Sequence, residues 1–248
     1  MRLAKFRSLP RLYLAGFALL STNCIGPDTL RADDATLHSA VEAARKTHDE
    51  SRLQSLKSQL EEKIAQDPKD AVSYLDLARV NAYLADVHEM KKDKKSEVAA
   101  VDKAIDLVQH SVQLNDKSAD AHSLLADLYG RKIGLGTPMF AGPKFGPKVK
   151  EENARAMALD DKNPVVWASL GRQYLMAPKM FGGDVSKAIE SFQKSLALDA
   201  AQGETWVWLA QAFRKQGDKT RTHDAVQHAL SLNPDSPWVK LWAASLEK

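Results

Sequence analysis

The sequence contains very little cysteine and few aromatic residues. Of its 248 residues one is a cysteine, Cys24, and 7% are Phe, Trp or Tyr. A single cysteine excludes an intramolecular disulfide and a CxxC metal-binding pair. With 12 Gly and 10 Pro, the chain is neither collagen-like nor Pro-rich. Its 44% hydrophobic and 27% charged residues are typical of a globular protein, either one domain or a short array of repeats.

Long hydrophobic runs are also missing, since no segment is apolar over the roughly 20 residues that cross a bilayer. The apolar run at residues 12–20 is too short to span, and it follows a basic start with Arg2, Lys5, Arg7 and Arg11. A basic start followed by a short apolar stretch is typical of a secretory signal peptide. We therefore expect export to the periplasm or the cell envelope.

The end of this leader has three interpretations. Leu30-Arg31-Ala32 favours cleavage after Ala32, which makes residues 1–32 the signal peptide. The rival is lipidation of Cys24, because Leu20-Ser-Thr-Asn-Cys24 resembles a bacterial lipobox, although Leu20 lies four residues before the cysteine rather than three. The third is an uncut apolar N-terminal helix. A lipid at Cys24 would be the expected membrane contact.

The positive net charge of the chain comes from the leader. Removing residues 1–32 takes away five of the 35 basic residues and one of the 32 acidic residues, which leaves a net charge of −1. A chain with this balance gives no reason to expect a nucleic-acid partner.

Strand-like alternation is absent as well. After residue 33 apolar residues recur three and four apart, and no segment alternates with a period of two over six residues. Helix-breaking pairs such as Asp67-Pro68, Asn163-Pro164 and Asn233-Pro234 separate the segments. We expect an all-α chain.

Aligned on these breaks, the segments repeat. The clearest copy has Trp167, Leu170, Gly171 and Tyr174 in its first helix, followed by Ala188 and Phe192 four apart. This pattern resembles the tetratricopeptide repeat (TPR), W-x2-L-G-x2-Y and then A-x3-F, whose period is 34 residues. Further copies begin at Trp206 and, with weaker signatures, at Tyr74 and His122.

The resemblance implies a TPR-type α-solenoid of stacked antiparallel helix hairpins, with about four repeats. The first repeat has 14 more residues than the regular copy, which predicts that both of its helices are longer by about two turns. The expected segments are N-terminal helices at 33–70, repeats at about 71–118, 119–163, 164–202 and 203–236, and a capping helix at 237–248.

Two segments rich in Gly and Pro, 134–147 and 177–184, are expected to be loops. Each lies between the two helices of its repeat, so both should meet at one edge of the solenoid. Their phenylalanines either fold back as a small apolar cluster over the helix pairs or form a rim that contacts a ligand. The rim residues would be Phe140, Phe145, Phe181, Gly182 and Gly183.

We find no catalytic, cofactor or metal-binding constellation. The seven histidines include no HExxH motif and no pair four residues apart. A chain cut after Ala32 would lack a cysteine nucleophile, and no GxSxG elbow occurs. We expect that the protein is not an enzyme and has no cofactor.

In TPR proteins ligands bind the concave face, which the first helix of each repeat lines. The resemblance implies that the contacting residues here are Arg79, Tyr83, Arg131, Arg172, Gln211 and Lys215. The cations in this set would suit a carboxylate or an acidic peptide. The alternative is a solvated face on which the cations pair with acids such as Asp76, Asp127 and Glu204.

The sequence thus predicts a non-catalytic exported TPR scaffold that binds a protein or peptide partner through its concave face. The alternative is a small-molecule-binding periplasmic TPR protein associated with a solute transporter, with its pocket under the segments 134–147 and 177–184. The repeats interrupted by these segments are similar to those of exported repeat proteins associated with solute transporters, such as the T component of some tripartite periplasmic transporters.

Overall fold

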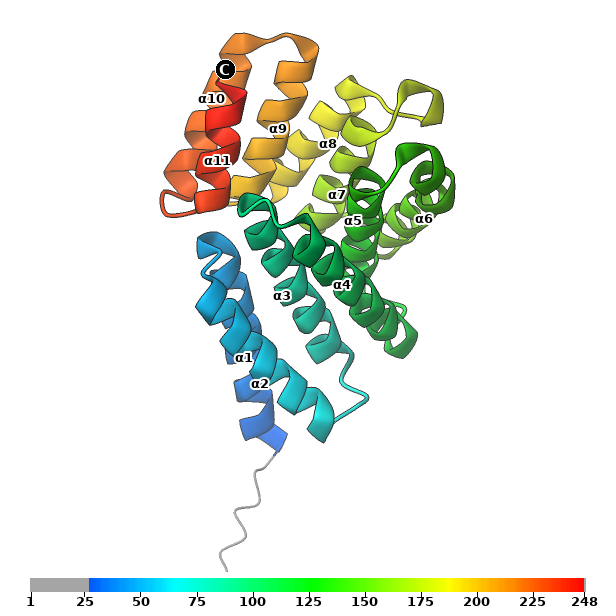
Figure 1. Cartoon of the computed structure of the whole chain (residues 1–248), viewed down its shortest axis with the longest axis vertical. Helices are drawn as coiled ribbons and strands as arrows, with labels where there is room; N and C mark the ends of the chain where they lie inside the picture. Colours follow the sequence, from blue (N-terminus) through cyan, green and yellow to red (C-terminus); the bar gives the residue numbers. More distant parts are fainter. Residues whose placement is uncertain (1–26, 248) are drawn as a thin grey trace, which may run out of the picture.

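The computed structural model describes residues 27–247 (Figure 1). Over this range the chain is helical, and its helices pack as consecutive antiparallel hairpins, so the expected fold class is confirmed. The apolar run of the leader and Cys24 lie outside the described residues. Within them, no helix combines the length and the apolar character that a membrane crossing requires.

The helices form pairs in chain order, followed by a single last helix (Figure 1). A short 3₁₀ helix, η1 (Lys179–Phe181), lies between the helices of one pair. The pairs are α1 (Pro27–Thr47) with α2 (Glu50–Gln66), α3 (Ala71–Met90) with α4 (Lys94–Leu114), α5 (Ala119–Leu135) with α6 (Pro138–Leu159), α7 (Pro164–Met176) with α8 (Val185–Leu198), and α9 (Gly203–Gln216) with α10 (Lys219–Leu232), and the last helix is α11 (Pro237–Leu246).

Local hydrogen bonds set where each pair begins. Helix α2 ends at Gln66, and the carboxylate of the next residue, Asp67, accepts a hydrogen bond from the backbone N–H of Lys69. Asp70 then caps α3 by accepting from the N–H groups of Val72 and Ser73. The turn before α5 repeats this arrangement with Asn115 and Ser118, and the turn before α7 with Asp160 and Asn163. Capping of this kind ends one helix and starts the next within a few residues.

The first repeat has the long helices that the sequence predicts. Helices α3 and α4 have 20 and 21 residues, whereas α9 and α10 have 14 each. The extra residues extend both helices to a tight turn, in which Lys92 has a φ of 59°. The extension brings Met90 against both apolar clusters of the core, one formed by α1–α6 and the other by α7–α11.

The expectation that residues 134–147 form a loop is wrong. Helix α5 continues to Leu135 and α6 starts at Pro138, so only Gly136 and Thr137 lie between the two helices. Pro138 occupies the first turn, where its missing N–H costs nothing. Pro143 and Pro147 lie inside α6, and the residue before each is a glycine, which has no Cβ to clash with the proline ring.

Residues 177–184 do connect α7 to α8 without a continuous α-helix. Pro178 precedes η1, and Gly182 ends it with a φ of 94°, a conformation that favours glycine. Asp184 then accepts hydrogen bonds from the N–H groups of Ser186 and Lys187, and so starts α8.

The solenoid closes on itself, which the sequence did not predict. Helix α11 returns to pack against α3 (Figure 1). The Trp238 ring on α11 stacks on His48, with ring centroids 6.3 Å apart, and both side chains are buried. Arg45 on α1 pairs with Glu204 on α9 across the same junction, at 3.8 Å. The two ends of the array therefore meet, and the chain's own side chains cover part of the face that the first helices line.

Candidate functional site

The cations expected on the concave face are bonded within the chain. We call Arg79, Arg131, Arg172 and Lys215 the inner row. The guanidinium of Arg79, largely buried, donates to Asp76 at 2.8 Å and to Asp120 at 2.5 Å. The guanidinium of Arg172 donates to both carboxylate oxygens of Asp127, at 2.9 and 2.5 Å.

The other two members of the inner row are also bonded. Arg131 donates to Glu97 at 2.8 Å and also contacts Asp86 and Glu89. The Lys215 ammonium donates to the carbonyl oxygen of Leu175 at 2.6 Å. The inner row therefore forms internal pairs, in part with the acids named in our alternative, Asp76 and Asp127, whereas Glu204 pairs with Arg45.

Tyr83 and Gln211, the two uncharged residues of the predicted concave set, are both partly buried. Burial raises the pKa of the Tyr83 phenol well above its ordinary value. The Tyr83 ring meets His48 edge-on, with centroids 6.3 Å apart. Gln211 is partly buried, and its Nε2 has no hydrogen-bond partner in the described part of the chain. The chain itself thus covers most of the surface of the three arginines, Tyr83 and Gln211, whereas Lys215 is exposed.

The sequence analysis missed several interior residues, among them Arg45, His48 and Asp86. Burial lowers the pKa of His48, but the hydrogen bond and negative charge of Asp86 outweigh burial, so its pKa lies above the ordinary value. Burial raises the pKa of Asp86, but the charge of Arg131 and the hydrogen bond with His48 lower it by more. The pKa of Asp86 therefore lies below its ordinary value. No repeat position marks Arg45 or His48, because they precede the first recognisable copy.

Exposed apolar side chains gather at one edge of the solenoid. The two turns α5–α6 and α7–α8 lie side by side at the upper right of Figure 1, and a Cβ on Gly182 would lie 3.7 Å from the Lys150 ammonium on α6. The five most exposed large apolar side chains of the described residues all belong to these two turns and the adjoining helix ends. This edge patch consists of Met139, Phe140, Met176, Met180 and Phe181, with exposed fractions of 56% to 81%.

The expected rim residues divide between core and surface. Phe145 packs inward on Tyr129, with ring centroids 5.6 Å apart, whereas Phe140 and Phe181 remain exposed. A Cβ on Gly183 would collide with the backbone of Ala177, so this glycine is required by the turn itself. The structure does not form a single phenylalanine cluster here.

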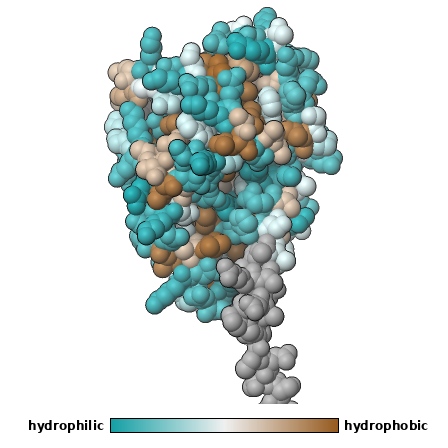
Figure 2. All heavy atoms as spheres, turned by 180° about the vertical axis from the view of Figure 1, so that it is seen from behind, coloured by the Kyte–Doolittle hydropathy of each residue, from teal (hydrophilic) through white to brown (hydrophobic). Residues whose placement is uncertain are grey.

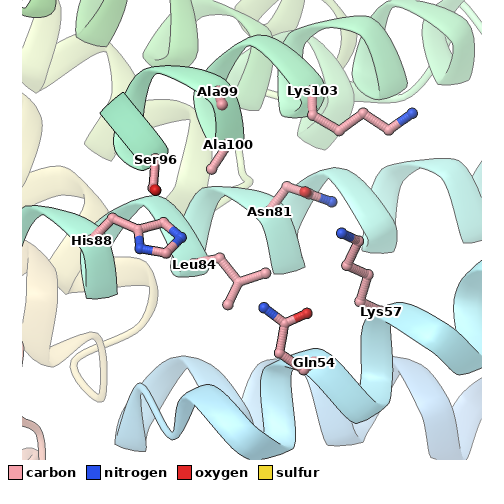
Figure 3. A pocket seen from close by; sticks show the side chains of 9 residues that line it. All are labelled: Gln54, Lys57, Asn81, Leu84, His88, Ser96, Ala99, Ala100 and Lys103. Carbon is pink, nitrogen blue, oxygen red and sulfur yellow. The ribbon is translucent and has the colours of Figure 1, made fainter. Parts of the chain in front are cut away.

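A groove lies on the outer side of the solenoid, between α2 and α4 (Figure 3). Asn81, Leu84 and His88 of α3 form its floor, and the groove encloses about 260 Å³. No acidic residue lines this outer groove, and its two lysines form no ion pair with any described residue. Its walls are Gln54 and Lys57 from α2, and Ser96, Ala99, Ala100 and Lys103 from α4.

A second groove, of about 680 Å³, lies between α1 and α2. Neither groove is lined by the segments 134–147 or 177–184. Among the described residues, no three His, Cys, Asp or Glu side chains are grouped so that they could hold a metal ion. Seen from behind, the surface is mostly hydrophilic with small apolar patches (Figure 2).

The stacked hairpins define a helical-repeat protein of the TPR type. Among solved structures the chain is similar to TTC0263, a thermophilic TPR protein in Thermus thermophilus, with a TM-score of 0.63 and 16% identity over 85% of this chain and 98% of that one. The chain belongs to the family described as "Regulator of microtubule dynamics protein 1-3", whose model matches residues 40–242.

Two further similarities are more distant. MamA has a TM-score of 0.42 and 17% identity, over 76% of this chain and 93% of its own. YrrB, described as a TPR protein with an unusual peptide-binding site, has a TM-score of 0.41 and 12% identity, over 87% of this chain and 97% of its own. Comparison with curated proteins finds no match.

Proposed function

We propose that this chain is a non-catalytic TPR scaffold, exported to the periplasm or the cell envelope, that binds an acidic segment of a protein partner in the outer groove. The observation that carries the proposal is the lining of this groove. Lys57 and Lys103 line the groove together with the polar groups of Gln54 and Ser96, and no acidic side chain is part of this lining. The family match supports the fold of this chain, and the proposal does not rest on the activity that the description of the family mentions.

The outer groove suits such a partner better than the inner row does. A ligand carboxylate that approached Arg79 or Arg172 would have to displace Asp76, Asp120 or Asp127, and each of these is already bonded at hydrogen-bond distance. Displacing one of these acids would leave a charge unpaired in a desolvated interior. The lysines of the outer groove lose no partner when they bind an anion, so binding there costs less.

Apolar side chains of the groove add a second kind of contact. In Figure 3 Lys57 and Lys103 lie toward one end of the groove, near Asn81, and Leu84, Ala99 and Ala100 lie farther along it. A segment with carboxylates toward the two lysines and apolar side chains toward Leu84 and the two alanines would match this arrangement. We therefore expect the partner segment to be both acidic and amphipathic.

Site-specific photo-crosslinking in cells of the source organism tests the partner site. The full chain would carry a photo-reactive amino acid at Ala99, in the groove, or at Ala244, an exposed alanine of α11 that serves as the matched control. We expect one protein to crosslink from position 99 and not from position 244. Lys57→Glu together with Lys103→Glu should abolish the crosslink. Equal crosslinking from both positions, or a crosslink that survives the charge reversal, contradicts the proposal.

Export is tested by the mass of the protein purified from fractionated cells. We expect a chain that begins at Asp33 in the periplasmic fraction. A lipid-modified chain that begins at Cys24 would place the protein at the envelope. An uncut chain in the cytoplasm contradicts export.

The second candidate is a small anionic ligand held in the same groove, which its two lysines without an ion pair to any described residue favour. Native mass spectrometry separates this candidate from the first. A small mass that is retained by the wild type and lost in Lys57→Glu/Lys103→Glu would support ligand binding. A bare chain that still crosslinks from position 99 would support the protein partner.

A further inference from the structure

The edge patch is unusual for the surface of a folded chain. Met180, Met139 and Phe140 are 81%, 77% and 73% exposed, more than any other large apolar side chain among the described residues. Single exposed apolar residues are ordinary, but several gathered on adjacent turns mark an interaction surface. This surface lies at the edge of the solenoid and includes no residue that lines the outer groove, so it adds a second function to the proposed one.

Unpaired lysines surround the edge patch. Residues 138–150 and 176–183 contain Lys144, Lys148, Lys150 and Lys179 and no acidic residue. These lysines form no ion pair with any residue between 27 and 247. The ammonium groups of Lys144 and Lys148 each lie 5.1 Å from the centre of an aromatic ring. These two ammonium groups thus lie over aromatic rings, and both lysines remain exposed at the surface.

Acidic side chains flank the two segments without neutralising them. Glu151 follows the first segment and is exposed on α6. Asp184 follows the second segment, and its carboxylate accepts the two backbone hydrogen bonds that cap α8. The charge beside the edge patch is therefore positive, and its binding partner must be negative.

We propose that the edge patch docks on an anionic lipid bilayer. The apolar side chains protrude from two turns instead of lining a recess. A protein partner would need a pocket shaped for each of them, whereas a bilayer deforms around protruding groups. Phe140, Met180 and Phe181 enter the boundary between headgroups and acyl chains, where aromatic and apolar side chains gain most. The surrounding lysines bind the lipid phosphates.

The test places a fluorophore at the edge patch and, as a control, at another exposed apolar position. The full chain with Cys24→Ser has no other cysteine, so Met180→Cys or Val72→Cys adds a single labelling site. Val72 is 54% exposed at the start of α3, away from the edge patch. Both proteins carry the same N-terminal segment, so that segment cannot produce a difference between them.

The probes are vesicles of phosphatidylcholine alone or of phosphatidylcholine with an equal share of phosphatidylglycerol. We expect the emission of the label at position 180 to shift to the blue with the anionic vesicles, and to shift back at high salt. The label at position 72 should not respond. No shift at position 180, or equal shifts at both positions, would overturn the proposal.

Substitutions give an independent measurement by vesicle flotation. Phe140→Ser/Phe181→Ser should weaken binding to the anionic vesicles by roughly tenfold or more, because it removes the inserted side chains. The matched control is Val72→Ser/Leu241→Ser, which removes two exposed apolar side chains elsewhere and should bind like the wild type. Unchanged binding of the Phe140→Ser/Phe181→Ser protein contradicts the proposal. If that protein instead loses a co-purified protein while the wild type ignores vesicles, the patch is a protein interface and the bilayer is excluded.

Discussion

A Cβ atom built on Gly171 would lie 2.6 Å from the ring carbon Cε1 of Phe192. Gly171 faces α8 from α7, and the Phe192 ring is completely buried between the helices. The two residues occupy the small and the aromatic positions of the repeat signature, W-x2-L-G and A-x3-F. The missing side chain is therefore what allows this helix pair to pack closely.

Gly171→Ala should destabilise the protein, although alanine is the better helix former. The buried Phe192 ring cannot move aside without disturbing its neighbours, and overpacking of this kind costs about 1–3 kcal/mol. Urea unfolding measures the change. The matched control is Gly130→Ala on α5, where a Cβ would meet nothing within 4 Å. The control should gain up to about 1 kcal/mol. Equal stability of the two variants would show that Gly171 does not limit the helix approach.

Arg79→Met should destabilise the protein by about 3–5 kcal/mol, because it leaves Asp76 and Asp120 without their buried partner. Arg155 serves as the control, since its pair with Asp116 is 3.2 Å long and lies at the surface. Arg155→Met should change the stability by no more than about 1 kcal/mol. Thermal unfolding of both variants decides the point. If the melting temperature of Arg79→Met is unchanged, Arg79 is free to bind a partner from the concave face.

The stability of the protein should depend on the protonation of His48. Its pKa is raised by Asp86 above the ordinary value of 6.5, against the effect of burial, while Arg45 opposes the rise and Glu204 supports it. A raised pKa in the folded state means that protonated His48 contributes its full stabilisation below pH 6.5. This contribution is lost as the pH rises through the folded-state pKa.

Comparison of His48→Asn with the wild type isolates this effect. Asparagine tolerates the positive φ of 48° at this position. Between about pH 6 and pH 9 the free energy of unfolding of the wild type should fall more steeply than that of the variant. Parallel pH profiles would mean that His48 carries the same charge in the folded and unfolded states.

The two phenylalanines of α6 should differ sharply in their effect on stability. Phe145→Ala removes the ring that stacks on Tyr129 and should cost about 1–3 kcal/mol, less than a fully buried ring. Phe140→Ala removes an exposed side chain and should change stability by no more than about 0.5 kcal/mol. Chemical unfolding of the two variants is the measurement. A large loss for Phe140→Ala would mean that this side chain packs on the protein and is unavailable for docking.

Expectations that depend on local spacing agree with the structure. The recurrence of apolar residues three and four apart gives α-helices, and the extra residues after Ala78 lengthen α3 and α4. The prediction of a loop at residues 134–147 is wrong because it treats every Gly and Pro in this segment as a helix breaker. Pro138 instead starts α6, and Gly142 and Gly146 make room for the prolines that follow them.

Much less of the candidate site could be predicted from the sequence. Positions on the first helices indicated that Arg79, Arg131 and Arg172 lie on one face, and the structure does bring them to the interior. Their partners could not be identified in advance, because Arg79 and Asp120 are 41 residues apart and Arg172 and Asp127 are 45 apart. Which acid meets which cation depends on how the hairpins stack.

By itself the sequence determined the helical repeat, since apolar spacing, helix caps and the small residue beside an aromatic ring act over a few residues or within one hairpin. Only the tertiary structure decided that α11 returns to α3, that His48 meets Trp238, and that the three arginines of the inner row form internal ion pairs. The physical reason is that small rotations between successive hairpins add up along the array and together set the curvature of the solenoid. No single repeat encodes where the two ends of the array will meet.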